Sequence, residues 1–103
     1  MRIIETREID GATGKSYSMN VYPADMRFND FIAGVFLLMA GDGTLLIGES
    51  DNVDMWLQKN EAASKLANEG FDKIGFIKNG SREVRQNMVS DLTEACSPKL
   101  AQI

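Results

Sequence analysis

Apolar and polar positions alternate at the beginning of the chain with the period of a β-strand. Residues 15–22 alternate cleanly, and residues 2–9 alternate less regularly; a two-residue period is typical of a strand with one buried face. Turn-forming residues 10–14 separate the two stretches, and Pro23 ends the second because proline cannot donate to a strand ladder. The pattern predicts an N-terminal β-hairpin within residues 1–23.

Two nearly continuous apolar runs follow, at residues 34–40 and 44–48. The sequence Gly-Asp-Gly at residues 41–43 separates them, and Asp-Gly between apolar runs is a strong signal for a tight hairpin. Strands that are apolar throughout are typical of a sheet that is covered on both faces. The pattern of apolar residues over 71–78 predicts a third central strand. We therefore expect a small antiparallel central sheet.

Helical patterns fill the remaining central part of the chain. A first helix is expected to open at Gly48, with Ser50 or Asp51 as its N-cap. A second, short helix is expected over residues 61–69, with Gly70 as a natural C-terminal stop. Three apolar residues of the first helix share one helical face: Val53, Trp56 and Leu57.

The last helix is expected to begin after Ser81, a good N-cap residue, and to end before Pro98. Its apolar residues recur at helical spacing: Val84, Met88, Leu92 and Ala95. The whole chain of 103 residues is therefore predicted to be one small soluble α+β domain, with an antiparallel central sheet flanked by helices and the N-terminal hairpin added to it.

Charge and cysteine content narrow the classes of function. The net charge is −4, histidine is absent, and the 11 basic residues are scattered. Tight binding of a phosphate backbone needs clustered Lys and Arg, so nucleic acid is the less favoured partner. Cys96 is the sole cysteine, which predicts a half-buried apolar side chain and an intracellular, cytoplasmic location. The longest apolar window is about half of a membrane span, so no membrane association is expected.

Two local motifs have both a chemical and a structural interpretation. Residues 11–16, with the sequence Gly-Ala-Thr-Gly-Lys-Ser, resemble a phosphate-binding loop, but Ile9 stands where that motif needs glycine. A hairpin turn is the favoured interpretation. Residues 49–54 are rich in oxygen ligands that suit a divalent cation, but acidic residues are also favoured in the first turn of a helix.

The segment Gly34-Val35-Phe36, followed after nine residues by Leu46-Ile47-Gly48, resembles the paired motifs of the GIY-YIG nuclease family. In that family the two motifs lie on a hairpin, and a helix follows after a short polar turn. Further helices, a third strand and a last helix with a closing proline motif then follow, here Pro98-Lys99-Leu100. The resemblance covers residues 34–100 and implies a GIY-YIG-like core.

The catalytic side chains of the family are missing when they are carried over position by position. Phe36 and Leu46 replace the two tyrosines of the motifs, and Trp56 replaces the helix arginine. Val89 stands at the position of the metal-binding glutamate, and Ala101 at that of the closing asparagine. Phosphodiester hydrolysis depends on charge stabilisation and metal positioning, so the resemblance implies no catalytic residue, metal or cofactor.

These observations favour a non-catalytic interaction or regulatory domain on a GIY-YIG-like scaffold, with another protein as partner and a homodimer as an open alternative. The candidate binding face comprises Phe36, Leu46, Glu49 and Trp56, with Trp56 either an exposed anchor or a core residue. Two alternatives remain open: a nucleic-acid-binding module that does not cleave, and a metal-dependent endonuclease with a relocated site. That site would use Glu49, Asp51, Asp54 or Glu94.

Overall fold

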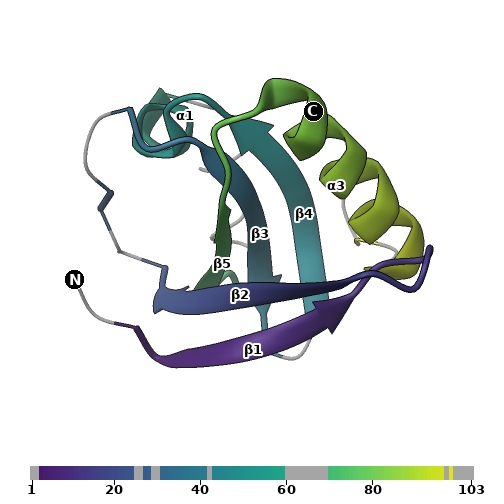
Figure 1. Cartoon of the computed structure of the whole chain (residues 1–103). Helices are drawn as coiled ribbons and strands as arrows, with labels where there is room; N and C mark the ends of the chain where they lie inside the picture. The colour runs from purple at the N-terminus through teal and green to yellow at the C-terminus, as the bar shows by residue number, and fades with distance from the viewer. Residues whose placement is uncertain are drawn as a thin grey trace.

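A computed structural model describes residues 3–24, 27–28, 31–41, 43–59, 70–96 and 98 of the chain. These residues form one antiparallel sheet with the strand order β1-β2-β5-β3-β4, together with two helices (Figure 1). The strands are β1 (Glu5–Asp10), β2 (Ser16–Pro23), β3 (Gly34–Ala40), β4 (Gly43–Ser50) and β5 (Lys73–Lys78). The helices are α1 (Val53–Lys59) and α3 (Arg82–Cys96). The predicted α+β class and antiparallel sheet are confirmed.

The N-terminal hairpin forms as predicted and extends the central sheet. β1 pairs with β2 from Glu5 opposite Val21 to Asp10 opposite Ser16. β2 then pairs with one edge of β5, so the hairpin covers an edge that the central strands alone would leave open. An isolated two-stranded hairpin is marginal in water, and pairing with β5 supplies the missing third neighbour.

The end of the central hairpin differs from the prediction. β4 continues to Ser50, which pairs with Gly34, so Gly48 lies inside a strand and does not open a helix. α1 begins only at Val53, and its N-cap is Asn52, whose Oδ1 accepts the Met55 amide at 3.2 Å. The expectation of a cap at residues 50 or 51 is therefore wrong, because pairing with β3 keeps the chain extended to Ser50.

Both faces of the sheet are covered, as the apolar runs predicted. The face toward α1 holds a cluster with Phe36, Leu38, Leu46, Ile74 and Phe76, against which Trp56 and Leu57 pack. The opposite face holds a second cluster with Met19, Val21, Leu37, Ile47 and Ile77, covered by Met88 and Leu92 of α3. The hairpin thus contributes Met19 and Val21, both fully buried, to the second cluster.

α3 begins and ends near the predicted residues but turns a different face to the sheet. Ser81 caps it, with its Oγ accepting the Val84 amide at 3.3 Å. Val84 is 42% exposed, whereas Arg85 is 1% exposed. The expected apolar stripe is therefore wrong at Val84, and also at Ala95, which is exposed. Cys96 is half-buried against the second cluster, as predicted.

Two further expectations concern residues that the structure does not describe or describes only in part. The predicted helix over residues 61–69 lies outside the described residues, and so do Lys99, Leu100 and Ala101. Among the residues that are described, no helix combines the length and the apolar character needed to cross a membrane.

Candidate functional site

The four residues of the predicted binding face do not share one accessible surface. Phe36 and Leu46 are 0% and 3% exposed, inside the cluster beneath α1. Trp56 is partly buried there, with its ring centroid 4.5 Å from that of Phe36. Glu49 lies on the other side of the sheet, because side chains alternate along β4, and it reaches α3 instead. The geometry thus brings Phe36, Leu46 and Trp56 together as core and places Glu49 apart.

Glu49 belongs to an ion-pair cluster around a buried arginine. Arg85 donates from Nε to Glu49 Oε1 at 2.7 Å, from Nη2 to Asp51 Oδ1, and from Nη1 to the Asn79 carbonyl at 3.1 Å. The Arg85 side chain is 2% exposed, so these acceptors replace the water that the guanidinium loses on burial. Sequence periodicity missed this arginine, because the expected stripe on the helix included its neighbour Val84 instead.

The other acidic residue of the same segment faces elsewhere. Asp54 accepts two hydrogen bonds from Arg27, at 3.0 and 2.9 Å, and one from the Phe28 amide at 2.9 Å. The hydrogen bonds from Arg27 hold the pKa of Asp54 below its ordinary value despite its burial. The carboxylates of residues 49–54 therefore diverge toward two arginines, and no cluster of three or more metal-ligating side chains occurs among the described residues.

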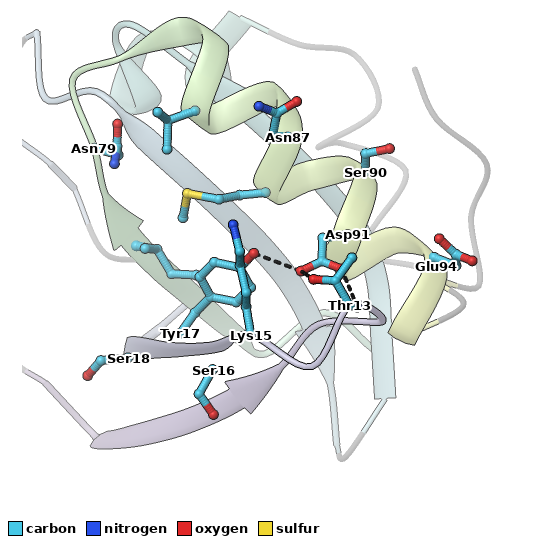
Figure 2. Close-up of a pocket in the computed structure, with 13 residues that line it drawn as sticks. Thr13, Lys15, Ser16, Tyr17, Ser18, Asn79, Asn87, Ser90, Asp91 and Glu94 are labelled. Atoms are coloured by element: carbon cyan, nitrogen blue, oxygen red, sulfur yellow. Dashed lines mark hydrogen bonds between the residues drawn. The ribbon is translucent and has the colours of Figure 1, made fainter.

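A cleft of about 770 Å³ lies between the N-terminal hairpin and α3, in a region that the sequence did not single out as a site. Figure 2 shows that the side chains of Thr13 and Tyr17 of the hairpin meet that of Asp91 of α3 within its lining. The cleft exists because the hairpin reaches across to α3 near the turn between its strands. The turn residues are those that resemble a phosphate-binding loop, and they form a hairpin turn as expected.

Asp91 fastens the hairpin turn to α3. Its carboxylate accepts hydrogen bonds from the Thr13 amide at 2.8 Å, the Thr13 hydroxyl at 3.0 Å and the Tyr17 hydroxyl at 2.7 Å. Gly11 packs so closely that an added Cβ would lie 1.9 Å from Asp91 Oδ2. One sequence signal could have pointed to this contact: Asp91 lies one turn beyond Met88 and next to Leu92, on the face that the helix was expected to bury. A buried aspartate requires hydrogen-bond donors nearby.

Asp91 and Tyr17, the two titratable groups of this contact, are stabilised in their ordinary protonation states. The hydrogen bond from Tyr17 makes the largest contribution to lowering the pKa of Asp91, and the hydrogen bonds from Thr13 lower it further. Burial, reinforced by Asp91, raises the pKa of Tyr17 to about 12. At neutral pH the carboxylate is ionised and the phenol protonated, with neither group tuned toward neutrality as a general acid–base catalyst would be.

The rest of the cleft is lined mainly by groups that both donate and accept hydrogen bonds. Hydroxyls come from Ser16, Ser18 and Ser90, and side-chain amides from Asn79 and Asn87. Lys15 and Glu94 add one charge of each sign, and Ile77, Val84 and Met88 add apolar surface. Such a lining suits a polar, uncharged ligand with many hydrogen-bonding groups.

Comparison with family models, with curated proteins and with solved structures finds no match. The glycines of the two GIY-YIG-like motifs have a packing reason of their own. An added Cβ at Gly34 would lie 2.5 Å from the Phe76 ring, and one at Gly48 would lie 2.6 Å from the Phe36 ring. The GIY-YIG resemblance therefore stays a prediction.

Proposed function

We propose that this chain is a non-catalytic binding domain and that the cleft between the hairpin turn and α3 is its binding surface. The observation that carries the proposal is the chemistry of the cleft. The hydroxyls of Ser18 and Ser90 and the side-chain amide of Asn87 make no hydrogen bond to another described residue and are available to a ligand. Ser16 and Asn79 are already bonded to Asp10 and to the Ser81 amide, and the carboxylate of Asp91 is engaged by three donors. Groups of this kind bind a ligand without supplying an activated acid, base or nucleophile.

The charge in the cleft favours a protein partner over nucleic acid. Lys15 is the single cation among its lining residues, against Asp91 and Glu94. A phosphate backbone binds where several cations replace its counterions. The net charge of the chain, −4, acts in the same direction.

The GIY-YIG-like scaffold is part of the proposal. It is supported by the order of the elements, in which the hairpin β3–β4 is followed by α1, β5 and α3, with Pro98 after the last helix. The residues at the motif positions, Phe36 and Leu46, are core residues without the hydroxyl groups of the family. On this scaffold the binding function would have moved to the side of the sheet that α3 covers.

Two measurements on the purified chain test the proposal. A plasmid-nicking assay with magnesium or manganese should give no cleavage above background; metal-dependent cleavage that Glu49→Ala or Asp51→Ala abolishes would overturn it. Amide chemical shifts should be followed during titration with mixed peptides, mixed oligosaccharides and single-stranded DNA. We expect peptides or saccharides to shift the signals of Thr13, Ser18 and Asn87. Shifts caused only by DNA, or by none of the three, would contradict the proposal.

A further inference from the structure

The ladder between β2 and β5 stops before the strands end. Pairing runs from Pro23 opposite Lys73 to Asn20 opposite Phe76. β2 nevertheless begins at residue 16 and β5 ends at residue 78. The two strands separate here because β2 bends toward α3, where the hairpin is fastened to Asp91 (Figure 1).

Beyond Asn20 and Phe76 the strands β2 and β5 leave an opening between them. The alternation of hydrogen bonds in the neighbouring ladders shows which main-chain groups face this opening. In the hairpin, the Gly11 amide donates to the Lys15 carbonyl at 2.8 Å, so odd-numbered residues of β2 bond to β1. The Asn79 amide donates to the Ala33 carbonyl at 3.2 Å, so odd-numbered residues of β5 bond to β3. Even-numbered residues of both strands therefore direct their amide and carbonyl groups toward each other.

Ser18 and Lys78 are the first even-numbered residues beyond the last pair. Each lies in a strand that is paired on its other side, Ser18 opposite Glu8 and Lys78 opposite Gly34. Continuation of the β2–β5 register would set them opposite each other, but the ladder does not include them. The opening is also accessible from both faces of the sheet, because Ser18 and Ile77 line the cleft and a second cavity of about 370 Å³.

α3 supplies a matching wall on one side of the opening. Val84, Asn87, Asp91 and Glu94 line the cleft at spacings of three and four residues, so they form one stripe along the helix. The stripe is about 15 Å long at the rise of an α-helix. An extended chain of roughly five residues covers the same length.

We propose that the cleft binds an extended peptide segment, which pairs its backbone with the open strand edge at Ser18 and lays side chains along α3. The inference rests on the proposed function and names its ligand class. A peptide is favoured over a saccharide because an open strand edge presents alternating amides and carbonyls, and these complement another backbone. The hydroxyls and amides of the wall satisfy the polar groups on the outer side of the peptide.

A selection from displayed random peptides of roughly seven residues supplies the probe, a length slightly greater than the stripe on α3. Selected peptides are then synthesised, and their affinities are measured by fluorescence polarisation. Asn87→Arg fills the cleft from an exposed position of α3, and Gln86→Arg places the same side chain at the neighbouring exposed position outside its lining. We expect binding to weaken about tenfold or more for Asn87→Arg and to stay unchanged for Gln86→Arg.

Single N-methylation along the peptide tests pairing with the strand edge. Only alternate amides of a paired strand face its neighbour, so methylation should weaken binding about tenfold at every second position and little in between. Equal effects at all positions would refute strand pairing while leaving the cleft as a binding site. If no selected peptide is sensitive to Asn87→Arg, the peptide inference is wrong. Shifts of cleft amides by oligosaccharides would then leave the proposed function standing, and their absence would remove it as well.

Discussion

At the scale of single residues, burial separates two carboxylates that bind the same arginine. Glu49 and Asp51 both pair with Arg85, but their side chains are 21% and 84% exposed. Water competes with an exposed ion pair and leaves it little net energy, whereas a buried guanidinium without its partner keeps an uncompensated charge. The two contacts therefore differ in energy although each places a carboxylate oxygen on the same guanidinium.

We expect Glu49→Ala to lower the free energy of unfolding by about 3 kcal/mol, the lower end for breaking a buried pair, because Glu49 keeps some exposure. Asp51→Ala is the matched control and should cost less than about 1 kcal/mol. Urea unfolding of both variants measures the difference. Equal losses would show that burial does not set the energy of this cluster.

Trp56 packs on Phe36 and is partly buried, which favours the core interpretation over the exposed anchor that the sequence left open. Trp56→Ala should destabilise the fold by about 3 kcal/mol, the lower end of the range for a buried tryptophan. Met55→Ala changes the neighbouring residue of α1, which is 46% exposed, and should stay within about 0.5 kcal/mol. Thermal melting compares the two variants. An unchanged melting temperature for Trp56→Ala would show that Trp56 is a surface residue.

Tyr17 should make stability depend on pH in the alkaline range. Folding raises the pKa of its phenol from 10.0 to about 12, so the folded state favours the protonated form. This stabilisation is complete below pH 10.0 and is lost as the pH rises through about 12. In Tyr17→Phe the free energy of unfolding should fall less steeply across that window. Parallel curves for the two proteins would contradict the assignment.

At the scale of elements, the decisive feature is that β2 belongs to two structures at once. Near Pro23 it is a sheet strand paired with β5, and near residue 16 it is half of a hairpin arm fastened to α3. The caps at Asn52 and Ser81 set where the two described helices begin, but no local signal sets where β2 leaves β5. The tertiary contact at Asp91 determines that point.

Hydrogen exchange should reveal this change along a single strand. The amides of Asn20 and Tyr22 face β5 within the ladder and should exchange slowly. The amides of Ser18 and Lys78 face the opening and should exchange much faster, although both lie in strands. Residue-resolved exchange by NMR measures all four. Equal protection at Ser18 and Asn20 would mean that the opening closes in solution.

At the scale of the whole molecule, the hairpin is an integral part of the domain. The sequence predicted an addition at residues 1–23 to a core at residues 34–100. The hairpin fills one side of the second cluster with Met19 and Val21 and covers the edge of β5. Without it, that cluster and that strand edge would both be exposed to water.

A chain that begins at Ala24 should therefore lack a cooperative thermal transition, because it loses β1, β2 and their buried side chains. A chain that begins at Ile4 removes the half-exposed Ile3 but no strand, and should melt within about 4 °C of the full chain. Calorimetry distinguishes the two. Cooperative melting of the shorter chain would show that the hairpin is a separable extension.

Periodicity and turn chemistry by themselves determined the five strands and the last helix of this protein, but not the start of α1. Both hairpins, the strand at β5 and the cap at Ser81 depend on neighbours a few residues apart, so local sequence specifies them. Pairing of β2 with β5, the burial of Arg85 and the cleft at Asp91 depend on partners far away along the chain. Periodicity can assign a polar residue to a helix, but only the tertiary structure decides whether the surface facing it is water, a carboxylate or a hairpin turn.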